Sequence, residues 1–228
     1  MPWQFSESAK RVRKAVYGGF LAEGRSGNIQ EIMKATGLST AQVHEALAEL
    51  ERGTILVREK HSHGSVVKAM PWANIPTHHI IHVEGHPKTY IGCALEIINI
   101  AECYPGKVVS VDSSCPHCGD SVTLKLKDDQ LIGFAPQETV IHIGVSPARW
   151  WDDWVLACAN TNFFPSLTHV REWEKAHPDL RGAVITIPVA KGKFKVSNRL
   201  DYDKEASDTG GAPLLQWLRD VGVAPKHW

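Results

Sequence analysis

The stretch "TYIGCALEIINIAECYP", residues 89–105, decides how the rest of the chain is interpreted. Its first residues favour a strand, and the apolar pattern after Gly92 favours a helix over residues 93–103. Cys93 and Glu96 are three residues apart and would share one face of that helix. A thiol that opens a helix lies at the positive end of the helix dipole, which predicts a lowered pKa for Cys93.

Glu96 stands among apolar neighbours, where a carboxylate is costly unless it is paired or used. Such a setting would raise the pKa of Glu96, so that the side chain carries a proton at neutral pH. The spacing by itself also allows a plainer interpretation, in which a buried structural Cys93 precedes a glutamate facing solvent. Cys158, in the apolar stretch "WVLACANTNFFPS", has the same alternative of a buried structural cysteine.

The composition is that of a balanced globular chain of 228 residues, with 25 basic and 25 acidic side chains. This balance gives no support to a nucleic-acid or membrane-surface partner. No apolar run approaches the ~20 residues that span a bilayer, and residues 1–16 lack the apolar core of a signal peptide. We therefore expect a cytoplasmic protein, in which the five cysteines would remain thiols.

Residues 1–77 have the outline of a winged-helix-like domain followed by a connector. Three helical patterns come first, and Asn28 and Gly37 are expected to begin and end the second of them. The β-rich segments "TILVREK" and "GSVVKAM" are expected to pair as a hairpin. The segments "HSHGS" and "PWANIP" fit no regular element and are interpreted as connections.

The candidate DNA-reading helix over residues 39–52 is acidic. It contains Glu45, Glu49 and Glu51 and a single arginine, and phosphates would repel these carboxylates. We expect this domain to be a scaffold or lid on the second domain, with DNA binding as the alternative.

Residues 78–228 are expected to form an α+β domain with a mixed or largely antiparallel sheet. Alternating or clustered β-forming residues predict five strands, in "HHIIHVEG", "KVVSVDS", "SVTLKLKD", "ETVIHIG" and "AVITIPVA". Helical patterns predict helices over 93–103, over about 148–160, in "SLTHVREWEKAH" and in "GAPLLQWLRDVG".

The motif "CPHCGD" places Cys115 and Cys118 at a spacing that suits zinc or redox chemistry. A second C-x-x-C is absent, although Cys93, Cys158 or His117 could complete a metal site. A strand follows the motif, which favours a hairpin turn, and the metal and redox roles stay open.

Other polar and aromatic clusters have ordinary interpretations. His78 and His79 begin a strand and should point to opposite faces, as solvent-facing or capping side chains. The pair in "HSH" is interpreted in the same way, and Cys103 as filler at a helix end. The tryptophans of "ARWWDDWV", residues 148–155, are expected to line the core or a domain interface.

Four landmarks follow in order along the chain: "YIGCALE", "SVDSSC", "CANTNFFPS" and "VREWEKAHPDLRGAVITIPVA". Together they resemble the organomercurial (alkylmercury) lyases over roughly residues 78–200. That family also carries a winged-helix-like N-terminal domain, which agrees with the helical pattern at the start of this chain.

The resemblance implies roles for individual residues. Cys93 and Cys158 match the two catalytic cysteines of the family, and Glu96 stands where the family has its catalytic aspartate. Cys115 matches a cysteine regarded as structural, whereas Cys118 has no counterpart. The resemblance thus implies that Cys93, Glu96 and Cys158 are both the catalytic residues and the mercury ligands.

The implied activity is cleavage of a carbon–mercury bond by protonolysis, as part of mercury resistance and detoxification. Thiolates are the ligands that a soft metal prefers, and a carboxyl group can pass a proton to the departing carbon. No cofactor is required, and Hg(II) would pass to cellular thiols or to a mercuric reductase. The glutamate in place of aspartate leaves a non-mercury enzyme as an alternative, and the N-terminal domain leaves a metal-responsive regulator.

Overall fold

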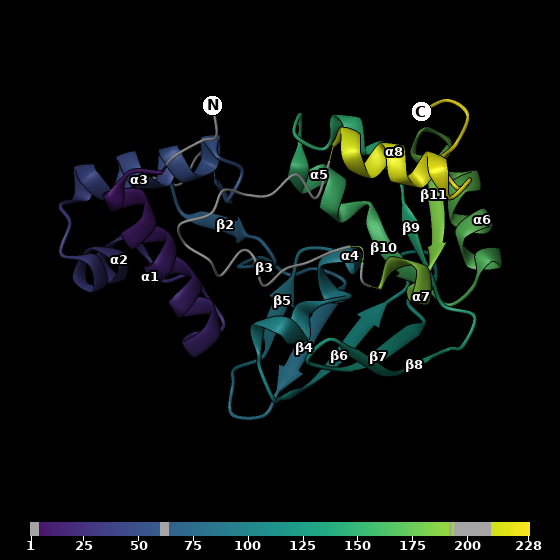
Figure 1. Ribbon diagram of the computed structural model, residues 1–228, viewed down its shortest axis with the longest axis horizontal. Coiled ribbons are helices and arrows are strands. Elements are labelled where there is room, and N and C mark those ends of the chain that lie inside the picture. The colour runs from purple at the N-terminus through teal and green to yellow at the C-terminus, as the bar shows by residue number, and fades with distance from the viewer. Residues whose placement is uncertain (1–4, 60–63, 192, 194–210) are drawn as a thin grey trace.

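The computed structural model describes residues 5–59, 64–191, 193 and 211–228. The chain is an α+β protein, in which three N-terminal helices precede two antiparallel sheets with short helices around them (Figure 1). This confirms the predicted fold class and, within it, the antiparallel alternative.

The N-terminal helices are α1 (Glu7–Glu23), α2 (Ile29–Thr36) and α3 (Thr40–Arg52). Asn28 caps α2 through a hydrogen bond from the Glu31 backbone N–H, and Gly37 ends it in the left-handed conformation. Ser39 caps α3 in the same manner as Asn28 caps α2. The predicted start and end of α2 are therefore confirmed, because short polar side chains satisfy the free N–H groups of a first turn.

The larger sheet has eight strands in the order β1-β2-β3-β5-β4-β6-β7-β8, and every neighbouring pair is antiparallel. The strands are β1 (Leu56–Arg58), β2 (Val66–Ala69), β3 (Trp72–Ala73), β4 (His79–Val83), β5 (Thr89–Ile91), β6 (Val108–Ser114), β7 (Ser121–Lys127) and β8 (Gln130–Ala135). The predicted hairpin is β1 with β2. Strand β3 lies in "PWANIP", so the interpretation of that segment as a connection is wrong. Strand β8 was not predicted either, because Gly133 and a mostly exposed pattern hide it.

The smaller sheet has the order β10-β9-β11, with β9 (Val140–Ile143) between β10 (Thr161–Phe164) and β11 (Ala183–Thr186). All four residues of β9 are buried, and its isoleucines lie in the main core. The strand predicted in "AVITIPVA" ends at Thr186, where Pro188 lies in the first turn of helix α7. Strand β10 was not predicted.

The other helices are short: α4 (Ala94–Ile97), η1 (Ile100–Cys103), η2 (Pro147–Arg149), α5 (Trp154–Ala159), α6 (Leu167–Ala176), η3 (Pro178–Leu180), α7 (Ile187–Ala190) and α8 (Ala212–Asp220). The continuous helix predicted over 93–103 is wrong, since it breaks between α4 and η1. The helix predicted near 148 begins only at Trp154, where Asp153 accepts a capping hydrogen bond from the Leu156 N–H.

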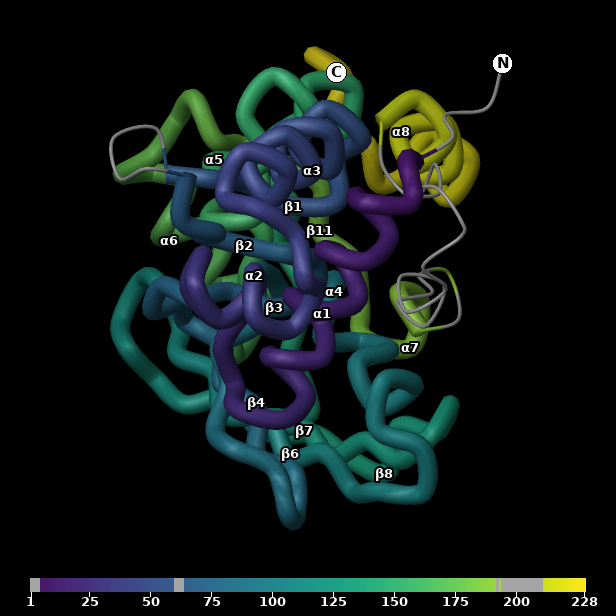
Figure 2. Tube along the Cα trace, turned by 90° about the vertical axis from the view of Figure 1, so that its left-hand side faces the viewer, coloured from purple at the N-terminus to yellow at the C-terminus, as the bar shows by residue number. Residues whose placement is uncertain are grey.

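Helix α1 packs on the sheet at Trp72 of β3. Figure 2 shows α1 in front of this part of the sheet. The indole of Trp72 is fully buried, stacks on Phe20 with ring centroids 5.6 Å apart, and meets the edge of Tyr17. Strand β3 also pairs with β5, so one sheet runs across the boundary predicted after residue 77. The division into domains 1–77 and 78–228 stays a prediction.

Two of the three glutamates on α3 bind other residues of the same chain. Glu49 accepts hydrogen bonds from the Ser6 backbone N–H and hydroxyl, and Glu51 pairs with Arg58 at 2.7 Å. The expectation that α3 does not read DNA stays a prediction. Among the described residues, no helix is both long and apolar enough to cross a bilayer.

Candidate active site

Cys93 and Glu96 lie at the junction of β5 and α4. The backbone N–H of Gly92 donates to the Pro71 carbonyl at 2.9 Å, which fixes the chain just before Cys93, the N-cap residue of α4. A Cβ on Gly92 would lie 2.6 Å from Lys68 Nζ and even closer to a Glu96 carboxylate oxygen. Only glycine therefore allows the ammonium and the carboxylate to approach this turn together.

Cys158 reaches the same place from the last turn of α5. The chain runs from α5 directly into β10, and α4 packs beside β10 (Figure 1). The sulfur atoms of Cys93 and Cys158 and a carboxylate oxygen of Glu96 all lie within 4.8 Å of one another. The structure thus brings together the three residues that the sequence singles out, although they lie up to 65 positions apart.

The lowered pKa predicted for Cys93 is wrong. Burial, which penalises the thiolate, raises the pKa of the Cys93 thiol well above its ordinary value. A hydrogen bond with Cys158 and the negative charges of Glu96 and Cys158 raise it further, whereas the Lys68 ammonium acts to lower it. Helix α4 has four residues, so its dipole is too weak to offset burial.

Lys68 is the residue of this site that the sequence reasoning missed. It lies on β2 with 2% of its surface exposed and forms a hydrogen bond with Cys158. Burial acts to lower the pKa of Lys68, but Cys158, Glu96 and Cys93 outweigh it and the pKa is raised. The sequence pattern that could have revealed it is the alternation in "SVVKAM", which places Lys68 on the same face of the strand as buried Val66.

A cavity of about 310 Å³ opens beside these groups. It is lined by residues of β2, of the segment before β4 and the start of β4, of the turn after β5, of α5 and of β10: Lys68, Ile75, Pro76, Thr77, His78, His79, Gly92, Val155, Cys158, Ala159 and Asn162. Its walls therefore combine apolar surface with the thiol and the ammonium, which suits a ligand that has an apolar group and a soft metal.

The two histidines at the start of β4 differ. His78 is exposed, and the prediction that the pair points to opposite faces is confirmed. His79 is buried, contrary to the prediction, because its ring lies edge-on against Phe163 of β10 and 2.9 Å from the Ser113 hydroxyl. Burial lowers the pKa of His79 to about 3, so its imidazole is neutral. The "HSH" histidines lie outside the described residues.

Cys115 and Cys118 do not join this site among the described residues. They lie in the turn between β6 and β7, where the Cys115 N–H donates to the Asp120 carbonyl at 2.8 Å. The predicted hairpin turn is therefore confirmed. Cys118 belongs to a separate group of possible metal ligands with Asp120 and His169.

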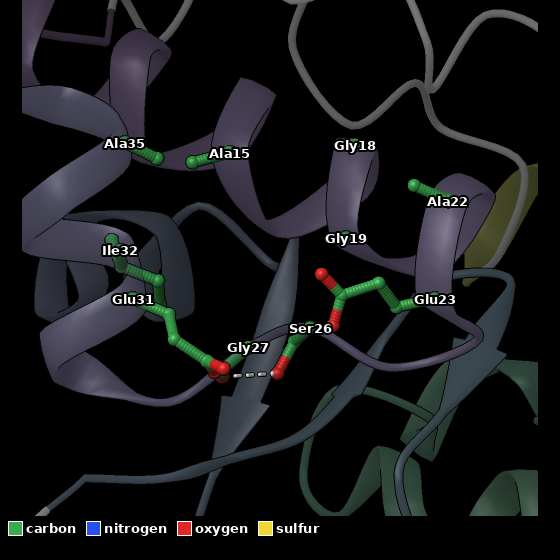
Figure 3. Close-up of a pocket in the computed structure, with 10 residues that line it drawn as sticks. All are labelled: Ala15, Gly18, Gly19, Ala22, Glu23, Ser26, Gly27, Glu31, Ile32 and Ala35. Atoms are coloured by element: carbon green, nitrogen blue, oxygen red, sulfur yellow. Dashed lines mark hydrogen bonds between the residues drawn. The ribbon is translucent and has the colours of Figure 1, made fainter.

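A second cavity, of about 360 Å³, lies between α1 and α2 (Figure 3). Small residues such as Gly18, Gly19 and Ala22 line it together with Glu23 and Glu31. Both glutamates pair with Arg25, at 2.6 and 2.7 Å, and no cysteine is present. This cavity offers no chemistry comparable to that of the site formed by Cys93, Glu96 and Cys158, which is called the thiol site below.

Comparisons with known proteins concern the family and the fold of this chain. The family model for alkylmercury lyase matches residues 73–195. Curated alkylmercury lyases of Staphylococcus epidermidis and Bacillus cereus are each 28% identical to this chain, over 70% and 73% of it and 69% and 72% of their own lengths. The crystal structure of the mercury-bound form of MerB2 shares the fold, with a TM-score of 0.66 and 22% identity over 87% of this chain and 92% of that one.

The chain belongs to the alkylmercury lyase family of enzymes. The family match includes Gly92 and all three convergent residues Cys93, Glu96 and Cys158. The resemblance drawn from the sequence is thereby confirmed.

Proposed function

We propose that this protein cleaves the carbon–mercury bond of organomercurials by protonolysis, with Cys93, Cys158 and Glu96 as its catalytic residues. The observation that carries the proposal is the convergence of two sulfur atoms and a carboxylate oxygen within 4.8 Å in a mostly buried site. Two thiolates that bind one metal at about 2.3 Å each are at most about 4.6 Å apart, so only a small movement is needed.

Binding begins when a thiol is exchanged onto the metal of R–Hg–X. Mercury is soft and prefers thiolate over oxygen ligands. The exposed edge of Cys158 faces the cavity, whereas Cys93 is buried beneath it, so Cys158 is the first ligand and Cys93 the second. The organic group then occupies the apolar part of the cavity near Ile75 and Val155.

Glu96 supplies the proton. Its carboxylate takes the proton that leaves Cys93 when the sulfur binds the metal, and it then transfers that proton to the carbon. The carbon–mercury bond breaks with its electron pair on carbon. The balance is R–Hg–X plus two thiols giving R–H, Hg(II) bound by two thiolates, H⁺ and X⁻.

Lys68 stabilises the negative charge that this sequence creates. Its ammonium forms a hydrogen bond with Cys158 and lies close to Glu96 and Cys93, in a place where water contributes little screening. A fixed positive charge there favours loss of the thiol protons without itself binding a soft metal, because an ammonium has no lone pair.

The product Hg(II) must leave a site with two thiolate ligands. Exchange with small cellular thiols or with the cysteines of a mercuric reductase is the reaction that suits this step, since only sulfur competes with sulfur for mercury. We place the enzyme in the cytoplasm, where these thiols are kept reduced. The reaction as written requires no organic cofactor.

The test separates binding from cleavage. Full-length protein is incubated with phenylmercury acetate and excess thiol, and benzene is measured in the headspace. Glu96→Gln keeps the shape of the side chain but cannot relay a proton, so it should bind phenylmercury and release benzene ~10²- to 10⁴-fold more slowly. Glu174→Gln, which alters a half-buried glutamate on α6, is the control and should retain the wild-type rate.

Two results would contradict the proposal. If the wild-type protein releases no benzene with excess thiol, the fold in this chain serves a non-mercury reaction. A Glu96→Gln variant as fast as the wild type would show that another group supplies the proton.

A further inference from the structure

The turn between β6 and β7 holds a second cluster of metal-ligating side chains, separate from the thiol site. The Cys118 sulfur, an Asp120 carboxylate oxygen and a ring nitrogen of His169 lie within 4.8 Å of one another. His169 is on the first full turn of α6, so the cluster joins this helix to the hairpin. None of the three residues takes part in the proposed lyase reaction.

The ring of His169 is held in the orientation of a metal ligand. Its Nδ1 lies 2.9 Å from the Ser166 hydroxyl, which leaves Nε2 directed towards Asp120 at 3.5 Å. Ser166 is the N-cap residue of α6, yet its side chain makes no capping hydrogen bond. The serine orients the imidazole instead, as an outer-shell partner does at histidine metal sites.

The turn presents a second sulfur next to Cys118. The Cys115 thiol forms a hydrogen bond with the Cys118 side chain, and the backbone N–H groups of His117 and Cys118 interact with the Cys115 sulfur. Gly119 has a φ of 80°, a left-handed conformation that lets the chain close the turn by donating to the Cys115 carbonyl at 2.9 Å. The turn is thus shaped before any ion arrives.

We infer that Cys118, Asp120 and His169 bind a divalent cation of the zinc class, with Cys115 as a further donor from the same turn. Thiolate, imidazole and carboxylate are the three ligand types that zinc takes, at about 2.0 to 2.3 Å. Ligand atoms within 4.8 Å of one another can therefore share one ion after small side-chain adjustments. The ion would cross-link the β6–β7 turn to α6.

A histidine–carboxylate pair on another part of the surface serves as a comparison for His169 and Asp120. His82 and Asp112 also form a histidine–carboxylate pair, at 2.9 Å, on neighbouring strands. Among the described residues no cysteine joins that pair in a ligand cluster. If the His169–Asp120 contact were only such an ion pair, the two histidines would behave alike towards a metal.

The experiment titrates Co²⁺ into full-length protein with Cys93→Ser and Cys158→Ser, which removes the competing thiol site. One equivalent should bind, with a thiolate-to-cobalt charge-transfer band, and Zn²⁺ should displace it. Adding Cys118→Ser or His169→Ala should weaken binding more than about 100-fold, and Ser166→Ala about 10- to 100-fold. Adding His82→Ala should leave the affinity unchanged.

A titration without a thiolate–cobalt band, or an unchanged affinity in the Cys118→Ser variant, would overturn the inference. If the Cys93→Ser/Cys158→Ser variant does not fold, the titration is done with the wild type. Cys118→Ser should then lower the amount of bound cobalt by one equivalent. Benzene release by Cys118→Ser should stay at the wild-type rate. Failure of the metal site is therefore distinguishable from failure of the lyase proposal.

Discussion

Replacing Lys68 with methionine tests whether a buried positive charge drives the chemistry of this site. Methionine has a similar length and flexibility but carries no charge. Lys68 is almost fully buried, and its positive charge acts to lower the pKa of Cys93. Its removal should therefore raise that pKa further, and the thiolate should become rarer at neutral pH.

The size of the effect follows from the geometry. An opposite charge at about 4 to 6 Å lowers an acid pKa by about 1 to 3. The Coulomb energy agrees, since two charges about 5 Å apart at an effective dielectric constant of ~20 interact by about 3 kcal/mol. The rate of phenylmercury capture by Lys68→Met at pH 7 should thus fall about 10- to 1,000-fold, and it should recover at higher pH.

Stability needs a separate control, because Lys68 also compensates the charge of Glu96. Breaking a buried ion pair costs about 3 to 5 kcal/mol, whereas replacing both partners is often neutral. The double variant Lys68→Met/Glu96→Gln should therefore unfold at a higher denaturant concentration than Lys68→Met alone. Lys125→Met makes the same change on an exposed position of β7 and should alter neither stability nor rate.

The assay is stopped-flow capture of phenylmercury from pH 6 to 10, done in the Glu96→Gln background so that turnover does not interfere. A Lys68→Met variant whose pH–rate profile coincides with that of its parent would refute the electrostatic role. A rate that is lower at every pH, with no shift of the pH–rate profile along the pH axis, would show that Lys68 acts only through packing.

Three further predictions concern the same site. Cys93→Ser and Cys158→Ser should each lose mercury retention and benzene release, because a hydroxyl is a hard and protonated ligand; retention by either variant on gel filtration would contradict this. Gly92→Ala should push the Glu96 carboxylate and the Lys68 ammonium apart and lower benzene release about 100-fold, as a ~1 Å misplacement does. Gly133→Ala is the control: no atom lies within 4 Å of the added carbon, so benzene release should not change. The raised pKa keeps Cys93 protonated at neutral pH, and a Glu96→Gln variant cannot take up the proton that Cys93 loses on capture. Capture by this variant therefore releases the proton to solvent, and its affinity for phenylmercury should rise with pH, up to about tenfold per pH unit; a pH-independent affinity would show that the thiol is already ionised.

The sequence by itself determined the local elements and the identity of the chemical groups. Caps such as Asn28 act within one turn, and alternation along a strand such as β7 depends only on neighbours. Cys93 and Glu96 also came from local spacing. Their link to Cys158, in contrast, came only from the order of four motifs and not from any periodicity.

The tertiary structure alone decided what those groups do to one another. The pKa of Cys93 rises because other segments bury it, and a helix of four residues cannot reverse that cost. Lys68 enters from β2, and His169 approaches Cys118 from α6, over sequence separations that no local pattern encodes. Electrostatic interactions and metal ligation depend on distance in space and on the exclusion of water, and both quantities exist only once the sheets and helices have packed.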